Sequence, residues 1–243
     1  KSTMGRLPRG VVWTLLLSIL IGQSVAQGDF GPPDSYDLDL GSTPADIVFV
    51  VDTSGFSNST ESLNQEVAVK GFLTGFLENA DINSGNVKVA MVTYSTHPKV
   101  IFDLNKYSTK TDMEDAVFLA DFEEEEPRER NLADALSLVR TKILVRDRRD
   151  APNFVLLLMS GKSDRNSVRT LQEADGLKFA RANIFGIGIS LDDDDAEEMF
   201  EVSSKPTMEN TFLISSVYEL EMLRELVFMQ IFASKIFASL SKK

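Results

Sequence analysis

Residues 45–55 read Ala-Asp-Ile-Val-Phe-Val-Val-Asp-Thr-Ser-Gly, and this stretch decides the fold. Its centre, residues 47–51, is an unbroken run of β-branched and aromatic side chains, which is typical of a strand buried on both faces. A polar turn, residues 52–55, follows at once. The stretch therefore predicts a central strand of an open α/β sheet, with a polar loop at its carboxyl end.

The same kind of pattern recurs along the rest of the chain. Further strands are predicted at residues 87–94, 99–102, 154–159, 184–189 and 211–214. Helices are predicted at residues 62–77, 110–119, 132–145, 168–182, 195–202 and 217–240. This alternation predicts a doubly wound, mostly parallel six-stranded sheet with helices on both faces, a Rossmann-like α/β fold. In the first helix we expect Leu63, Val67, Phe72 and Phe76 on the face toward the core.

The N-terminus has the order of a secretory signal peptide. Arg6 and Arg9 precede an uncharged apolar run at residues 11–21, which is too short to span a bilayer comfortably. The small residues Ser24, Val25 and Ala26 follow, so we predict a signal peptide over residues 1–26. The alternative is an anchor that is not cleaved.

Composition limits what the remaining chain can do. We expect a flexible leader at residues 27–44 and one domain at residues 45–240, with no membrane span after cleavage. The chain has 37 acidic and 25 basic residues and a formal net charge of −12, which disfavours binding to nucleic acid. It contains no cysteine, so thiol catalysis and zinc sites built on thiolates are excluded.

Several motifs in the right order resemble the von Willebrand factor type A domain. They are the opening stretch at residues 45–55 and the segments 86–95, 133–136, 155–164 and 184–189. The resemblance covers about residues 44–240 and is greatest to the A domains of matrilins, collagen-associated chains and single-domain invertebrate matrix proteins. It implies a non-enzymatic adhesion or matrix protein.

Many members of this family bind a divalent cation at the polar rim, in the metal ion-dependent adhesion site. The resemblance assigns Asp52 and Ser54 to the first and third positions of the Asp-x-Ser-x-Ser loop. The fifth position is Phe56, which has no oxygen, although Ser57 stands next to it. Magnesium requires oxygen ligands in a near-octahedral arrangement, so the loss weakens the site.

The other two loops depart from the family pattern as well. Leu132 stands where the family has Thr, and Ser160 replaces the Asp of the third loop. We therefore expect no resident cofactor and at most weak Mg²⁺ or Ca²⁺ binding on Asp52 and Ser54, with Ser57 and Ser160 as further oxygen donors. Asp134 or Asp164 compensates only if the loops shift. In the alternative interpretation, Asp52 and Ser54 only cap the turn and the next helix.

Three other features carry weaker signals. Asn58 begins an Asn-Ser-Thr sequon and is a glycosylation candidate in an exported chain. The acidic runs at residues 123–126 and 192–195 are interpreted as solvated charge, with weak Ca²⁺ or mineral contact as the alternative. His97 is the only histidine and lies in a predicted hairpin turn, so a hydrolase acting through Ser54 or Ser160 lacks a nearby base.

The sequence thus predicts a secreted, non-enzymatic, protein-binding component of an extracellular matrix. The acidic composition is compatible with a mineralised matrix. The expected partners are extracellular matrix proteins such as collagen-like chains, and a mineral or Ca²⁺-bearing surface is the further candidate. The alternative function is a divalent-cation-dependent, receptor-like adhesion module. The helix at residues 217–240 has more apolar surface than one sheet face requires, which favours self-association through this helix.

Overall fold

The computed structural model describes residues 44–57, 59–122, 129–146, 148, 151–163 and 167–240. The predicted signal peptide and nearly all of the predicted leader lie outside this range, as do Asn58, Asp164 and the acidic run at residues 123–126. The predicted boundaries of leader and domain therefore remain predictions.

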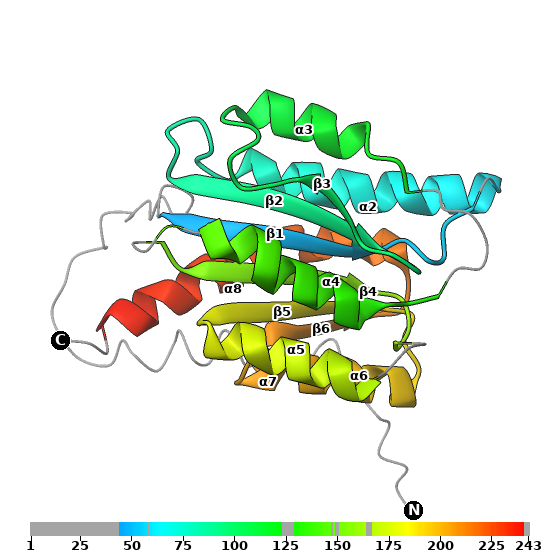
Figure 1. Ribbon diagram of the computed structural model, residues 1–243. Coiled ribbons are helices and arrows are strands. Elements are labelled where there is room, and N and C mark those ends of the chain that lie inside the picture. The colour runs from blue at the N-terminus through cyan, green and yellow to red at the C-terminus, as the bar shows by residue number, and fades with distance from the viewer. Residues whose placement is uncertain are drawn as a thin grey trace, which may run out of the picture. The chain divides into compact units, whose positions relative to one another are not determined.

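Six strands form one sheet in the order β3-β2-β1-β4-β5-β6 (Figure 1). Their bounds are β1 (Ala45–Asp52), β2 (Val87–Tyr94), β3 (Lys99–Phe102), β4 (Asn153–Met159), β5 (Ala182–Ile189) and β6 (Thr211–Ile214). Neighbouring strands are parallel except for the edge pair, in which β3 runs antiparallel to β2. The predicted doubly wound, mostly parallel sheet is confirmed.

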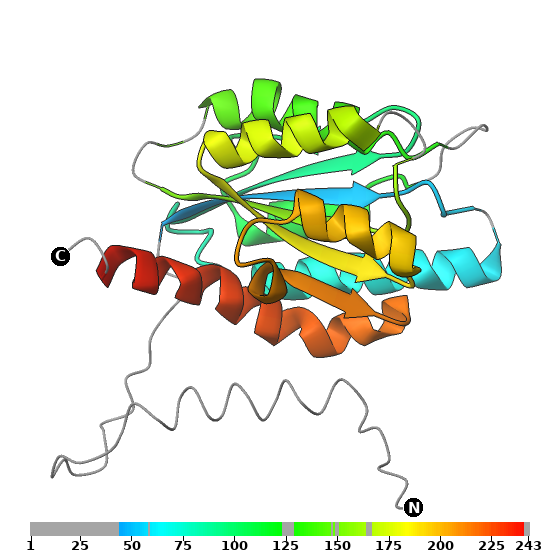
Figure 2. The same cartoon turned by 90° about the horizontal axis from the view of Figure 1, so that it is seen from below.

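Helices cover both faces of this sheet (Figures 1 and 2). One face carries α2 (Thr60–Glu78), α3 (Lys110–Phe118) and α8 (Leu220–Leu240), and the other carries α4 (Leu132–Leu138), α5 (Ser167–Phe179) and α6 (Asp193–Val202). A short helix, α7 (Thr207–Asn210), precedes β6, and a 3₁₀ turn (Val217–Glu219) leads into α8. No helix among the described residues combines the length and the apolar character that a membrane span requires.

The central strand β1 is buried along its whole length, as its unbroken apolar run predicts. Ile47, Phe49 and Val51 contribute to the core under α2 and α8, whereas Val48 and Val50 contribute to the core under α4 and α5. Each of these side chains is at most 1% exposed, and burying one stabilises the fold by roughly 1.5–3 kcal/mol. The strand therefore fixes the position of its polar carboxyl end.

Helix α2 is rotated relative to the sequence prediction. Phe72 and Phe76 lie in the core as expected, but Leu63 and Val67 are 45% and 66% exposed, so that part of the prediction is wrong. The reason is that Val69 and Leu73 join the two phenylalanines in the core, and this larger set turns Leu63 and Val67 toward solvent.

The predicted helix at residues 132–145 is also less regular than expected. It begins as α4, continues as a π-helical turn (Val139–Ile143) and ends as a 3₁₀ turn (Leu144–Arg146). The hydroxyl of Thr141 donates to the carbonyl of Ser137 at 2.7 Å, a bond that competes with the regular helical ladder.

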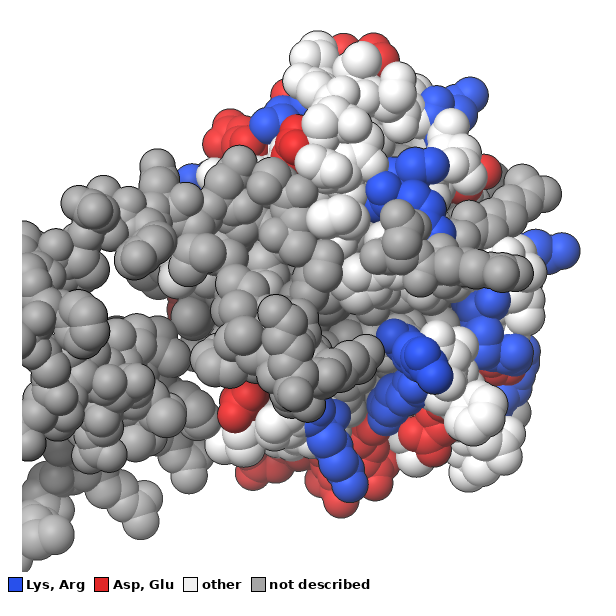
Figure 3. Space-filling view, turned by 90° about the vertical axis from the view of Figure 1, so that its left-hand side faces the viewer, with Lys and Arg blue, Asp and Glu red and all other residues white. Residues whose placement is uncertain are grey.

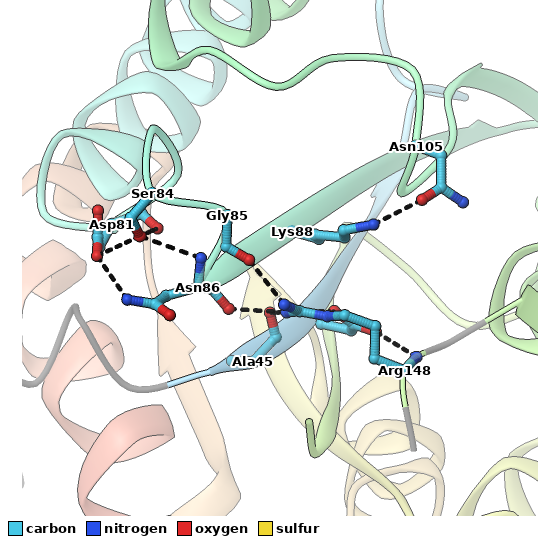
Figure 4. Close-up of polar contacts among 9 residues, drawn as sticks. Ala45, Asp81, Ser84, Gly85, Asn86, Lys88, Asn105 and Arg148 are labelled. Carbon is cyan, nitrogen blue, oxygen red and sulfur yellow. Dashed lines mark hydrogen bonds and ion pairs between the residues drawn. The ribbon is translucent and has the colours of Figure 1, made fainter. Parts of the chain in front are cut away.

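The amino end of β1 is held by Arg148. Its guanidinium lies 2.7 Å from the Asp46 carboxylate, and it also donates to the carbonyls of Ala45, Gly85 and Asn86 (Figure 4). Because Asp46 is 0% exposed, the contacts with Arg148 take the place of its water shell. The contact ties β1 to the loop before β2 and to the loop before β4.

Candidate functional site

The polar loops after β1 and β4 meet at the carboxyl edge of the sheet, as the parallel pairing of the two strands requires. We call this edge the rim; it lies at the arrowhead end of the strands in Figure 1. Asp52 ends β1, and Ser160 directly follows β4. The rim therefore brings together two residues that the sequence assigns to the candidate metal site.

Four donors from serine residues surround the Asp52 carboxylate. The backbone N–H and the hydroxyl of Ser54 donate to Oδ1, at 3.0 and 2.7 Å. The backbone N–H and the hydroxyl of Ser160 donate to Oδ2, at 3.1 and 2.7 Å. The Asp52 side chain is only 2% exposed, so these bonds take the place of its water shell.

A fifth donor carries a positive charge. Nε of Arg130 lies 3.3 Å from Oδ2 of Asp52, and the Arg130 side chain is 28% exposed. Arg130 comes from the loop before α4, where the N–H of the next residue, Asn131, donates to the carbonyl of Ser95 at 2.9 Å. A Cβ atom added at Gly161 would lie 2.8 Å from Cζ of Arg130, so the glycine leaves room for the guanidinium.

The remaining positions of the family site offer no ligand oxygen toward Asp52. Phe56 is 8% exposed and packs against Phe122, with ring centroids 5.4 Å apart. Leu132 is 1% exposed and belongs to the core under α4. Ser57 is used locally, because its hydroxyl contacts that of Ser59 at 3.3 Å and its N–H donates to the hydroxyl of Ser62 at 2.6 Å.

These residues do not fit a divalent cation as they stand. Magnesium needs several oxygen ligands whose lone pairs point at the ion, yet both oxygens of Asp52 accept hydrogen bonds and the Ser54 and Ser160 hydroxyls donate to them. Arg130 also brings a positive charge to the same carboxylate. Across the described residues, no group of three or more His, Cys, Asp or Glu side chains is arranged to hold a metal.

Asp134, a candidate for compensating the lost carboxylate, is engaged elsewhere. Its Oδ1 lies 2.6 Å from a guanidinium nitrogen of Arg169, and its Oδ2 accepts from the side-chain amide of Asn131 at 2.7 Å. Asn131 in turn caps α4 by accepting from the N–H of Asp134 at 3.2 Å. The other candidate, Asp164, lies outside the described residues.

Tyr94 lies beside the rim at the end of β2, where it pairs with Asp52 in the sheet register. It is 0% exposed. Burial raises the pKa of its phenol well above the ordinary value, and the negative charge of Asp52 raises the pKa further. The phenol is therefore neutral at physiological pH and is no base for the neighbouring serines. His97 is exposed in the turn between β2 and β3.

The acidic run at residues 192–195 forms the start of α6. Oδ1 of Asp192 accepts from the N–H of Asp195 at 2.8 Å, which makes Asp192 the N-cap. Asp193, Asp194 and Asp195 follow in the first turn, where negative charge is favourable for the helix dipole. A role in helix stability accounts for this run.

The opposite end of the sheet carries a groove of about 890 Å³. Its walls include Lys178, Arg181 and Lys205. Figure 3 views the face at the amino ends of the strands and shows basic and acidic side chains side by side on its lower part. Lys178 is used within the protein, since it contacts Asp175 at 3.2 Å and the carbonyl of Glu201 at 2.8 Å. The groove therefore carries charges of both signs.

Sequence reasoning missed both arginines that pair with the aspartates of β1. Arg130 and Arg148 lie in charged loops without any motif. The sequence offered one indirect signal: Asp46 and Asp52 flank an apolar run, and an aspartate that is buried there requires a nearby cation or several donors.

Comparison with known proteins agrees with this architecture. The family model for the von Willebrand factor type A domain matches residues 46–226. The collagen alpha-4(VI) chain of Mus musculus is 28% identical over 70% of this chain and 7% of its own length. Integrin alpha-2 and matrilin-3 of Mus musculus are 38% and 34% identical over 28% and 31% of this chain. The match spans 5% of that integrin and 15% of that matrilin.

Solved structures share the fold at lower sequence identity. Proximal thread matrix protein 1 from the mussel byssus superposes with a TM-score of 0.70 and 20% identity, over 78% of this chain and 48% of that chain. A second structure of that protein, described with a zinc-occupied MIDAS motif, gives a TM-score of 0.68 and 21% identity, with the same coverage. These likenesses support the fold.

Proposed function

Because the chain belongs to the von Willebrand factor type A domain family, we propose that it is a secreted matrix protein that binds another matrix protein without a divalent cation. Its relatives include a collagen chain, an integrin and a matrilin, which are adhesion and matrix proteins rather than enzymes. The chain spans less than a sixth of the length of these relatives, so the proposal concerns this domain. The signal-peptide pattern at residues 1–26 supports secretion.

The contact between Arg130 and Asp52 carries the cation-independent part of the proposal. A metal ion at this edge would have to displace the guanidinium and break the hydrogen bonds from Ser54 and Ser160. The ion would then meet one carboxylate instead of the two of the family pattern, with Ser160 at the second position. Each of these changes lowers the affinity for a hard cation.

Recognition then depends on protein surface near the rim. Helix α2 begins eight residues after Asp52, and its outward-facing Leu63 and Val67 are 45% and 66% exposed. At the end of α3, Phe118 and Leu119 are 68% and 78% exposed. The end of α3 lies against α2, because Lys70 of α2 donates to the carbonyl of Phe118 at 2.9 Å. We call these four residues the α2–α3 patch.

An exposed apolar surface of this kind is typical of protein interaction sites. Large apolar side chains at the centre of an interface commonly carry most of its affinity. We therefore place the contact with a collagen-like or related matrix protein on the α2–α3 patch, beside the rim. At this location the partner would bind at the rim end of the domain without contacting a cation.

Binding of the full chain to immobilised collagen-like matrix proteins tests the proposal. Binding measured in millimolar Mg²⁺ and in EDTA should have the same affinity. The double change Leu63→Ser and Val67→Ser should weaken it at least about tenfold, equivalent to about 1.4 kcal/mol. Phe179→Ser, at a 92% exposed phenylalanine at the end of α5, is the matched control and should leave binding unchanged.

Three results would contradict the proposal or part of it. Loss of binding in EDTA would favour the alternative function, a cation-dependent receptor-like module. Binding that survives the double change in α2 would remove the α2–α3 patch from the interface. Absence of binding under both conditions would exclude collagen-like chains as the partner.

A further inference from the structure

Helix α8 has two apolar faces. One face packs on the sheet and on α2, through the buried residues Leu220, Val227, Phe228, Ile231 and Phe232. On the other face, Met222, Leu226 and Met229 are 76%, 39% and 53% exposed. A helix that covers one side of a single domain needs only one apolar face, so the second face requires another explanation.

The exposed residues have the spacing of a coiled-coil seam. Met222, Leu226 and Met229 are separated by four and then three positions. In the sequence, Ala233, Ile236 and Leu240 continue the same alternation to the end of the helix. A 4-3 repeat of apolar residues places one continuous stripe along a helix and is the pattern of paired helices. We call these six positions the outer seam.

The outer seam is complementary to itself when two copies run antiparallel. Its spacing is four, three, four, three, four, which reads the same from either end. In an antiparallel pair, position 222 therefore lies opposite position 240 of the partner helix, 226 opposite 236, and 229 opposite 233. A two-fold axis through the middle of the seam generates this arrangement, and two-fold dimers are the commonest homo-oligomers.

Charge along α8 favours the same arrangement. The acidic residues Glu219, Glu221 and Glu225 lie just before and within its first turns, where they outnumber one basic residue, Arg224, and no acidic residue follows Glu225 in the given sequence. The basic residues Lys235, Lys242 and Lys243 lie toward the end of the chain. Antiparallel pairing brings the acidic start of one helix to the basic end of the other, whereas parallel pairing brings like charges together.

Met222, Leu226 and Met229, the residues of the outer seam whose side chains the structure describes, are exposed. The helix runs along one flank of the domain beside α2, and its last turns extend past the amino ends of the strands (Figure 2). The helix begins at the rim end of the domain, because Val217, just before it, lines the same small pocket as Asp52 and Ser160, and it ends at the amino ends of the strands (Figure 2).

We propose that a second copy of this chain binds the outer seam of α8, with the two helices antiparallel. This inference stands on the helix alone and does not depend on the matrix partner or on the absence of a metal. Its consequence is a dimer that presents two rims, which raises the avidity for a repetitive matrix protein.

The oligomeric state of the full chain tests the proposal. Light scattering after size exclusion should give twice the mass of one chain at about 50 µM, a concentration at which even micromolar affinity shows. Replacing Met222, Leu226 and Met229 by serine should give a monomer with an unchanged circular dichroism spectrum. Val168→Ser with Phe179→Ser, an exposed apolar pair on α5 outside both proposed surfaces, should leave the dimer intact. A monomeric wild type, or a dimeric triple variant, would overturn the proposal.

The orientation has its own test, because the chain contains no cysteine. Met222→Cys mixed with Leu240→Cys should give a disulfide-linked pair of the two variants on mild oxidation. Met222→Cys alone should not cross-link, because its partner position is 240. Efficient cross-linking of Met222→Cys alone would show parallel helices and contradict the antiparallel arrangement.

Discussion

Strand β1 has a buried aspartate at each end, and the two ends are held differently. At the amino end, Arg148 contacts the Asp46 carboxylate at 2.7 Å, donates its backbone N–H to the same group at 3.0 Å, and binds three backbone carbonyls. At the carboxyl end, Arg130 makes one contact of 3.3 Å with Asp52, whose other donors come from Ser54 and Ser160.

The difference distinguishes the Arg148–Asp46 pair, which we expect to be structural, from the Arg130–Asp52 pair at the rim. Among the described residues, Arg148 is the charged side chain that pairs with Asp46, so we expect both to be important for stability. Asp52 has four neutral donors besides Arg130, so the arginine is replaceable while the carboxylate stays satisfied. At the rim, an arginine contacts the carboxylate that the family resemblance assigns to the metal position.

The largest expected effect is on the amino-end pair. Arg148→Ala should lower the free energy of unfolding by about 3–5 kcal/mol, because it leaves Asp46 charged and buried without its partner. Urea denaturation followed by circular dichroism measures this change. A loss below about 1 kcal/mol would show that water reaches Asp46 and would remove the contrast between the two ends.

The carboxyl-end pair should tolerate the same change better. Arg130→Ala should cost only about 1–2 kcal/mol, since Asp52 keeps its bonds to Ser54 and Ser160. The same denaturation experiment applies. If Arg130→Ala lowered the free energy of unfolding as much as Arg148→Ala, both pairs would be structural and the contrast between the two ends of β1 would be wrong.

Two glycines at the rim sharpen the assignment of Arg130. A Cβ atom at Gly161 would lie 2.8 Å from Cζ of Arg130, whereas a Cβ atom at Gly55 would lie no closer than 4.0 Å to the Ser160 hydroxyl. Gly161→Ala should therefore displace Arg130 and cost about 1 kcal/mol, and Gly55→Ala should stay within about 0.5 kcal/mol. In an Arg130→Ala background the effect of Gly161→Ala should largely vanish, and additive losses would contradict the assignment.

The smallest effect concerns Glu198, a 7% exposed carboxylate without an ion pair in the described part of the chain. Burial raises its pKa, although the N–H of Ser163, which donates to it at 2.6 Å, opposes the shift. A carboxyl group whose pKa is raised by folding destabilises the protein as the pH rises through its unfolded and then its folded pKa. Glu198→Gln should therefore raise the melting temperature near pH 7 and change it little near pH 4. Equal effects at both pH values would contradict this interpretation.

The strands and their mostly parallel, doubly wound sheet were predictable from the sequence, because the long apolar runs of the central strands can be buried only inside a covered sheet. The lost ligand positions at Phe56 and Leu132 were also predictable, since neither side chain has an oxygen. The rotation of α2 was not, because Leu63 and Val67 fit a helical stripe as well as Val69 and Leu73 do.

The two arginines could not be predicted for a different reason. Arg130 lies 78 positions from Asp52, and Arg148 lies 102 positions from Asp46. No local spacing connects such residues, and only the folded sheet brings their loops to the ends of β1. The role of Ser160 could not be predicted for the same reason. Ser160 stands where the family has an aspartate, and only the folded sheet brings its hydroxyl close enough to donate to Asp52.

Thermal unfolding of the wild-type chain with and without a divalent cation tests the central claim most directly. A ligand present at about 100 times its dissociation constant stabilises a protein by about 2.7 kcal/mol, which moves the melting temperature by several degrees. We predict that millimolar Mg²⁺ or Mn²⁺ gives the same melting temperature as EDTA. A rise of several degrees that Asp52→Ala abolishes would show a working metal site at the rim and would contradict the account.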